Sequence, residues 1–180
     1  MNLNQKKILV VVLGATATGK TAVSVELARK FSTEILSCDS RQFYHEIPIG
    51  TAAPTAEELA LAPHHFIATR SLTDDYSCGK YEHDAIALLD KLFEKHSVVI
   101  MTGGSGLYID AVCNGMDQMP SDVAIRESLA ARLETSGLES LVDELKGLDP
   151  QYCQTADLAN KQRVLRALEV SMASGKPYSS

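Results

Sequence analysis

The sequence predicts an α/β fold in which helices flank a parallel sheet, with an all-helical insertion or appendage after it. Apolar runs at residues 7–13, 35–38 and 97–101 are typical of buried strands. Segments with helical periodicity separate these runs, and alternating strands and helices indicate a parallel sheet. After residue 115 the strand-like runs stop. We therefore expect an α/β core over residues 1–115 and a helical region over residues 116–180.

The first strand leads directly into a glycine-rich loop with the pattern G-x-x-x-x-G-K-T, and a helical pattern follows. The backbone N–H groups of such a loop and the helix dipole favour a di- or triphosphate. Lys20 supplies a positive charge, and the Thr21 hydroxyl suits a phosphate-bound Mg²⁺. The pattern predicts a P-loop NTPase-like core whose phosphate site consists of Gly14, Ala15, Thr16, Ala17, Thr18, Gly19, Lys20 and Thr21.

Two helices of the core carry apolar stripes that we expect to face the sheet. They are predicted over residues 21–31 and 81–95, with stripes formed by Val23, Leu27 and Phe31 in the first and by Ile86, Leu89 and Phe93 in the second. Between them, Thr55 and Glu58 form a capping box that opens a short helix. Residues 64–68 are a candidate third strand, and residues 102–106 are expected to form a turn.

The helical region has its own start and stop signals. Asp122 precedes a helix, Gly137 separates it from a second one, and Asp149-Pro150 has the N-cap and first-turn proline of a third. The last helix is expected over residues 160–172, and Gly175 closes it.

Asp39 follows the second strand, and ligands of open α/β sheets bind outside the carboxyl ends of the strands. Its carboxylate could act as a general base, or it could cap a turn, and local sequence does not decide between these roles. Arg41 and Gln42 offer contacts to bases or phosphates in the same loop. The run Gly103-Gly104-Ser105-Gly106 permits close approach of a ligand, although glycines also occur in ordinary turns.

The strand at residues 98–101 ends in glycines rather than in the aspartate that nucleotide-hydrolysing P-loop proteins use to help hold Mg²⁺. Unless another strand carries that acid, a group transferase is favoured over an ATPase. A P-loop small-molecule kinase and a regulatory nucleotide-binding module remain alternatives. The kinase would need an arginine-rich lid, and no arginine lies between Lys80 and Ser105.

The net charge of −6 does not exclude an RNA partner, because basic residues cluster late in the chain. Arg163 and Arg166 lie three residues apart, so they could contact phosphates together or form a solvated face paired with Glu169. The histidines and cysteines lack the spacing of a zinc site. No signal peptide or membrane span is recognisable, which predicts a cytoplasmic protein, and no feature indicates a protein partner.

Together these residues resemble the tRNA dimethylallyltransferases, also called tRNA isopentenyltransferases. The resemblance extends over nearly the whole chain, and its motifs are Gly14–Thr21, Asp39–Gln42 with Tyr44, Ile49–Ala52, Pro63–His65, Gly103–Tyr108, Arg126, Gln162-Arg163 and Arg166–Val170. Ala15 stands where the family commonly has proline, and Ser105 stands where it commonly has threonine. Members are also longer, so we expect a carboxyl-terminal part to be missing.

The resemblance implies that this protein transfers a dimethylallyl group from dimethylallyl diphosphate to N6 of the adenosine on the 3′ side of the tRNA anticodon, with Mg²⁺. The P-loop would hold the diphosphate, and Asp39 would take the proton from the amine. Catalytic roles are implied for Asp39 and Thr21. Contacts with the anticodon loop are implied for Asp39, Ser40, Arg41, Gln42, Ser105, Arg126, Gln162, Arg163, Val164, Leu165 and Arg166.

Overall fold

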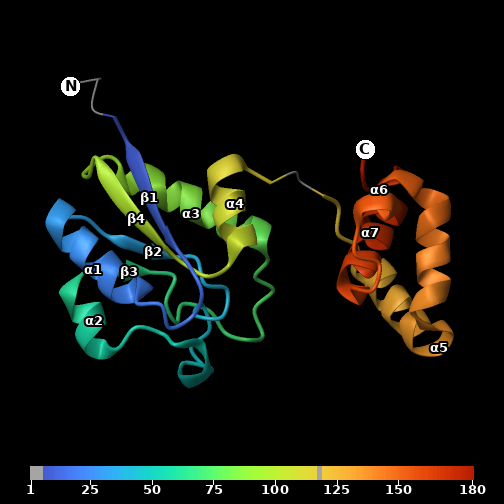
Figure 1. Cartoon of the computed structure of the whole chain (residues 1–180), viewed down its shortest axis with the longest axis horizontal. Helices are drawn as coiled ribbons and strands as arrows, with labels where there is room; N and C mark the ends of the chain where they lie inside the picture. Colours follow the sequence, from blue (N-terminus) through green and yellow to red (C-terminus); the bar gives the residue numbers. More distant parts are fainter. Residues whose placement is uncertain (1–5, 117–118) are drawn as a thin grey trace. The chain divides into compact units, whose positions relative to one another are not determined.

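The computed structural model describes residues 6–116 and 119–180, and the chain divides into two compact units, Met1–Met116 and Asp117–Ser180. Figure 1 labels the helices and strands of both units. The division falls one residue after the boundary that the sequence predicts. No helix among the described residues is both long and apolar enough to cross a membrane.

The first unit contains a four-stranded sheet in the order β1-β4-β2-β3, and every pair of neighbouring strands is parallel. The strands are β1 (Ile8–Leu13), β2 (Ile35–Ser37), β3 (His64–His65) and β4 (Val98–Gly103). The predicted parallel sheet is confirmed. Among the described strands β1 pairs only with β4, and its end residues Ile8 and Leu13 are 41% and 68% exposed.

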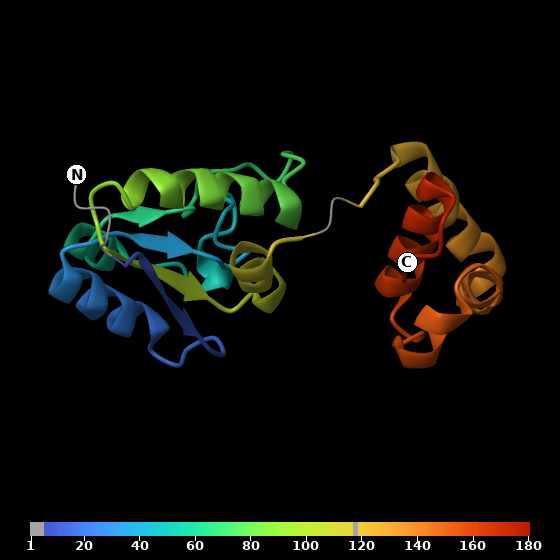
Figure 2. The same cartoon turned by 90° about the horizontal axis from the view of Figure 1, so that it is seen from above.

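Helices cover both faces of this sheet (Figure 2). The helices of the first unit are α1 (Lys20–Phe31), α2 (Ala56–Leu61), α3 (Cys78–Leu92) and α4 (Gly106–Asn114), and a short 3₁₀ turn spans Ile49–Thr51. On the α1 side the core contains Val25 and Ala28 packed with Ile35 and Ile100. On the α3 side it contains Tyr81 and Leu89 with strand residues such as Leu36 and Met101.

The stripe predicted for α1 is wrong at Val23 and Phe31, whereas Leu27 is partly buried against the core as expected. Its buried residues are Ser24, Val25 and Ala28, whereas Val23 and Phe31 are 47% and 44% exposed. Small side chains let the helix lie close to the sheet, and this close packing outweighs the larger apolar residues on the neighbouring side.

The stripe predicted for α3 is confirmed at Leu89 and Phe93, which pack against the core, and is wrong at Ile86. The helix begins at Cys78, because the Ser77 hydroxyl caps it by accepting the Lys80 N–H. Its buried residues are Tyr81, Ala85, Leu89 and Leu92, and Ile86 is 41% exposed.

Local backbone conformation sets the other strand ends. β3 stops at His65 because Phe66 and Ala68 adopt positive φ angles of 62° and 49°, so the strand is shorter than predicted. β4 continues through Gly103, so the first two residues of the predicted turn belong to the strand. The predicted capping box at Thr55 and Glu58 is confirmed.

The second unit consists of α5 (Val123–Leu148), α6 (Pro150–Thr155) and α7 (Lys161–Ser174). Gly137 interrupts α5 with a non-helical backbone, φ 76° and ψ 171°, which confirms the predicted break. The core between α5 and α7 contains Leu129, Leu141, Leu145, Val164 and Leu168. The predicted caps at Asp122 and Asp149 and the predicted stop at Gly175 are also present.

Candidate functional site

The carboxyl ends of three strands lie level at one edge of the sheet. Leu13 of β1 pairs with Gly103 of β4, and Ser37 of β2 pairs with Thr102 of β4. The segments that follow these strands therefore leave the sheet side by side. They contain the P-loop, Asp39 and the glycine-rich run predicted to form the site, so the fold brings these sequence motifs together.

The P-loop turns from β1 into α1 without any side chain capping the helix. Gly19 occupies the N-cap position with φ 84°, a conformation that favours glycine. The Lys20 Nζ and the Thr18 hydroxyl both donate to the Ala15 carbonyl, at 2.6 and 2.8 Å. The N–H groups of the first helical turn have no intrahelical acceptor, so this loop presents donors and one positive charge to an anion.

The helices that begin at this edge of the sheet differ from the other α-helices in how their N-termini are capped. Among the α-helices of the described residues, α1 and α4 alone lack a side-chain cap. The helices α2, α3, α5, α6 and α7 are capped by Thr55, Ser77, Asp122, Asp149 and Asn160. The two uncapped N-termini follow the level strand ends, where a bound anion would satisfy their donors.

Asp39 uses one carboxylate oxygen and its carbonyl to hold a turn, which is one of the two roles that the sequence left open. One carboxylate oxygen, Oδ1, accepts the Arg41 N–H at 3.1 Å, and the Asp39 carbonyl accepts the Gln42 N–H at 3.0 Å. This oxygen therefore holds the turn. The other oxygen, Oδ2, accepts no hydrogen bond from another described residue, and it lies on the side of Gly104.

Packing requires glycine at position 103 but leaves room for a Cβ at position 104. A Cβ at Gly103 would lie 2.7 Å from the Cys38 carbonyl carbon and from its Sγ, so no side chain fits there. A Cβ at Gly104 would lie 3.6 Å from the Gly14 carbonyl oxygen and 3.9 Å from Asp39 Oδ2, which is ordinary contact. The start of the P-loop and the Asp39 carboxylate are thus both neighbours of Gly104.

Ser40 and Ser105 contact each other across this edge. The Ser105 hydroxyl accepts the Ser40 N–H at 3.0 Å and donates to the Ser40 hydroxyl at 3.2 Å. Gln42 is used internally, because its amide nitrogen donates to the carbonyls of Thr51 and Ala52 and its oxygen accepts the Ser37 hydroxyl. Gln42 therefore fixes the following loop, while Arg41 is exposed.

Buried groups beneath the site support it. The sequence predicts a buried structural role for Cys38, which is confirmed, but sequence reasoning did not single out Tyr81. The Tyr81 hydroxyl donates to the Ser37 carbonyl at 2.9 Å, and its ring stacks on Phe43. The four-residue spacing of Tyr81, Ala85 and Leu89 is the signal that could have identified Tyr81 as a buried residue of α3. Burial, and next the charge of Asp39, raise the pKa of the Cys38 thiol to about 12, so this cysteine is no nucleophile at neutral pH.

The residues at the P-loop fit a magnesium ion that is bound mainly through phosphate. The described residues contain no group of three or more His, Cys, Asp or Glu side chains able to hold a metal. Thr21 lies in the first turn of α1, and its hydroxyl bonds to no other described residue. Mg²⁺ keeps several waters and takes few protein ligands when it binds with phosphates, which suits this site.

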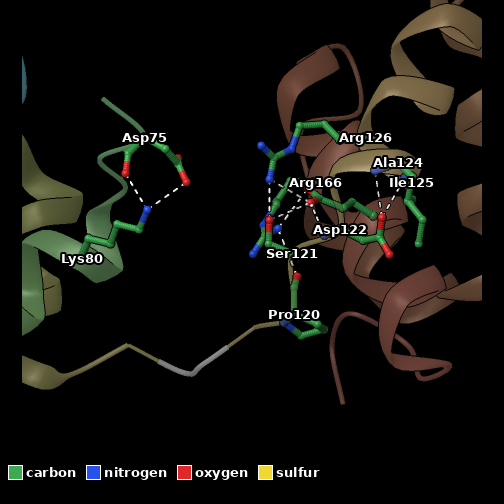
Figure 3. A network of polar contacts seen from close by, with 10 residues as sticks. Asp75, Lys80, Pro120, Ser121, Asp122, Ala124, Ile125, Arg126 and Arg166 are labelled. Atoms are coloured by element: carbon green, nitrogen blue, oxygen red, sulfur yellow. Dashed lines mark hydrogen bonds and ion pairs between the residues drawn. The ribbon is translucent and has the colours of Figure 1, made fainter. Parts of the chain in front are cut away.

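The remaining predicted residues belong to the second unit. Gln162 and Arg163 are exposed in the first turn of α7, whereas Val164 is fully buried, so its side chain serves the core. Leu165 is half-buried. Arg126 and Arg166 converge beside Ser121 (Figure 3), and both donate to the buried carboxylate of Glu169.

Known proteins share this sequence and fold. Residues 42–180 match the family described as IPP transferase. The chain belongs to the IPP transferase family. It is 48% identical over 175 residues to tRNA dimethylallyltransferase 1 of Bacteroides fragilis, and the match covers 97% of this chain and 58% of that protein. The resemblance predicted from the sequence motifs is confirmed.

Solved structures of IPP transferases have the same fold. The full-length tRNA isopentenylpyrophosphate transferase of Bacillus halodurans is 35% identical to this chain, with a TM-score of 0.61. The match covers 96% of this chain and 58% of the Bacillus chain. A eukaryotic dimethylallyltransferase acting on tRNA, also a crystal structure, is 25% identical, with a TM-score of 0.78. That match covers 97% of this chain and 43% of the eukaryotic chain. This IPP transferase chain thus spans little more than half the length of its bacterial relatives.

Proposed function

We propose that the protein carrying this chain transfers a dimethylallyl group from dimethylallyl diphosphate to N6 of the adenosine on the 3′ side of the tRNA anticodon. The observation that carries the proposal is that Asp39 Oδ2 and the Gly14 carbonyl oxygen, at the start of the P-loop, are both neighbours of Gly104, in a chain of the IPP transferase family. This proximity supports a reaction in which Asp39 accepts a proton while the P-loop holds a diphosphate.

The P-loop would stabilise the leaving diphosphate. As the allylic C1–O bond breaks, negative charge grows on the diphosphate oxygens and a delocalised cation forms on the carbon chain. The open N–H groups at the start of α1 and the Lys20 ammonium face that charge, and prepositioned donors of this kind lower the barrier most. Lys20 would exchange its bond to the Ala15 carbonyl for one to the diphosphate.

Asp39 would accept the proton that the amine loses. N6 of adenosine attacks C1, a new N6–C1 bond forms, and one N6 proton passes to Asp39 Oδ2. The other carboxylate oxygen stays on the Arg41 N–H, so the turn keeps the base in place. General bases typically contribute about 10²–10⁴-fold when they lie within hydrogen-bond reach.

Mg²⁺ would be held by the Thr21 hydroxyl and the diphosphate, and it supplies neutralisation of the diphosphate charge. The other P-loop residues would position the phosphates through their backbone.

The RNA would be held by groups from both units. Ser40, Arg41 and Ser105 lie at the sheet edge, and Gln42 shapes their loop. The second unit contributes Arg126 and the segment from Gln162 to Arg166. Chemistry on a base requires it to leave the stack, and single-stranded loops such as the anticodon loop allow this readily.

A P-loop small-molecule kinase is the second candidate. It is favoured less because β4 ends in Gly103 and leads into Gly104, without an acid for the metal of a nucleotide, and because no arginine lies between Lys80 and Ser105.

The test incubates the protein with labelled dimethylallyl diphosphate, Mg²⁺ and unmodified tRNA. We expect label in a tRNA with adenosine 3′ to the anticodon and none in a matched tRNA with guanosine there. Phosphate transfer from ATP to a small molecule, with no label in either tRNA, would overturn the proposal.

A further inference from the structure

Glu169 of α7 is a buried carboxylate that gathers two arginines from different helices. Its side chain is 4% exposed. Oε1 accepts from Arg126 Nη2 of α5 at 3.0 Å, and Oε2 accepts from Arg166 Nη1 of α7 at 3.0 Å. This carboxylate thus joins Arg126 and Arg166, although the two arginines lie far apart in the sequence.

The same carboxylate also binds the segment that precedes α5. Oε1 accepts the Ser121 hydroxyl at 3.2 Å and the Asp122 N–H at 3.1 Å. The arginines strengthen this link, because Arg126 donates to the Ser121 hydroxyl and Arg166 donates to the Pro120 carbonyl at 3.3 Å. Figure 3 shows this convergence around Ser121. Both guanidiniums are therefore held by more than one bond.

Glu169 is ionised in this setting. Burial by itself raises its pKa, but the hydrogen bonds from Arg126 and Arg166, with help from the Asp122 N–H and the charge of Arg166, lower the pKa below its ordinary value. An apolar side chain of similar size often stabilises a protein as well as a buried ion pair does. Stability alone thus gives a weak reason for a buried carboxylate at this position.

The two guanidiniums still face solvent. The side chain of Arg126 is 55% exposed and that of Arg166 is 38% exposed. A guanidinium has five N–H donors in a rigid plane that matches a phosphate, and fixing that plane reduces the entropy lost on binding.

We propose that Glu169 is a positioning residue that holds Arg126 and Arg166 as a fixed pair for contact with the phosphate backbone of RNA. This inference rests on the proposed function, which assigns both arginines to the tRNA. It deepens that function by adding a carboxylate that never touches the RNA.

The sign of the effect separates positioning from simple electrostatics. A carboxylate near an RNA surface repels the phosphates, so its neutralisation should strengthen binding if the carboxylate does nothing else. If it positions the arginines, its loss should weaken binding and reduce the dependence of the dissociation constant on salt, because fewer phosphates are neutralised.

The experiment measures binding of fluorescently labelled, unmodified tRNA to the full chain across a range of KCl concentrations. We expect Glu169→Gln to weaken binding about 5- to 20-fold and to reduce the salt slope by about one. Glu144→Gln is the matched control, because Glu144 pairs with Arg132 within the same unit. It should leave binding unchanged or strengthen it.

A second variant covers the case in which Glu169→Gln does not fold. Glu169→Asp keeps the charge and shortens the side chain, so it should also weaken binding while electrostatics alone predicts no change. Thermal melting followed by circular dichroism reports folding of each variant. If both variants unfold, or if folded variants bind as tightly as the parent protein, Glu169 is structural and the inference is wrong.

Arg126→Ala and Arg166→Ala separate this inference from the function on which it rests. If neither arginine variant weakens tRNA binding, the assignment of these arginines to RNA fails. If both weaken it and the folded Glu169 variants do not, only the positioning role fails.

Discussion

The two units differ in whether their own side chains bind the polar groups of the candidate site. At the strand-end edge of the first unit, α1 and α4 begin without side-chain caps. In the second unit, every described helix has a side-chain cap, and Arg126 and Arg166 share the buried Glu169. The strand-end edge of the first unit thus leaves backbone N–H donors without a side-chain acceptor. The second unit holds two arginines with the carboxylate of Glu169.

This difference matches the ligands that we propose. A small diphosphate can enter a loop and accept hydrogen bonds from uncapped N–H groups. An RNA backbone is a long and flexible polyanion, and a surface with arginines already fixed loses less entropy in meeting it. The following predictions test each half of this comparison, beginning with the largest expected effect.

Asp39 should be required for transfer and not for tRNA binding. We expect Asp39→Asn to lower the rate of dimethylallyl transfer by about 10²–10⁴-fold, since the amide can still hold the Arg41 N–H but cannot accept a proton. Single-turnover transfer and tRNA binding are measured on the same preparation. Near-normal transfer by this variant would exclude Asp39 as the general base.

Lys20 should matter for the diphosphate. Lys20→Met is expected to weaken the binding of inorganic pyrophosphate with Mg²⁺ by about 10- to 100-fold, because a charge-assisted hydrogen bond contributes about 1.5–3 kcal/mol. Calorimetric titration measures this loss. Lys30→Met removes the same charge from the last turn of α1 and should leave the affinity unchanged. Equal losses in both variants would show that only overall charge matters.

Gly103 and Gly104 form a matched pair for the architecture of the site. Gly103→Ala should lower the free energy of unfolding by about 1–3 kcal/mol, because its Cβ would press on the backbone and Sγ of Cys38. Gly104→Ala should fold normally, since its nearest contact would be 3.6 Å. Chemical denaturation compares the two. A stable Gly103→Ala protein would contradict the close approach of β4 to Cys38.

Acid should destabilise the first unit at the end of the sheet opposite the site, and this is the smallest effect. Burial lowers the pKa of His64, and the hydrogen bond from His65 lowers the pKa of Glu34. Both groups bind a proton more readily when unfolded, so stability present at neutral pH is lost as pH falls below their ordinary values of 6.5 and 4.5.

Urea denaturation of the parent protein at a series of pH values measures this loss. His64→Gln should flatten the first step, and His83→Gln, at a residue whose side chain is 86% exposed, should not. A parent protein whose stability rises on acidification would contradict the assignment.

The sequence predicted the order of the elements and the site motifs because both depend on local signals. The P-loop, the break at Gly137 and the caps at Asp122 and Asp149 each lie within a few residues of their effect. The residues of α1 and α3 that face the sheet were harder to predict, because their burial depends on how closely each helix approaches the sheet. Ala28 and Ala85 are buried for that reason, while Phe31 and Ile86 are exposed.

Long-range partners could not be predicted from one sequence. Pairing between Arg166 and Glu169 follows from helical spacing, but the burial of Glu169 and the arrival of Arg126 depend on the packing of α5 against α7. One carboxylate oxygen of Asp39 holds the turn and the other lies beside Gly104. This second placement likewise depends on the register of β2 with β4, which the sequence does not reveal.

The outer edge of β1 has a practical consequence for handling the protein. Six consecutive apolar residues form this strand, and among the described strands only β4 pairs with it. Unpaired N–H and C=O groups along an apolar strand recruit other strands and promote aggregation, and charged residues such as the preceding Lys7 counteract this only locally. The 180-residue chain should therefore aggregate increasingly as its concentration rises, unless further polypeptide covers this edge.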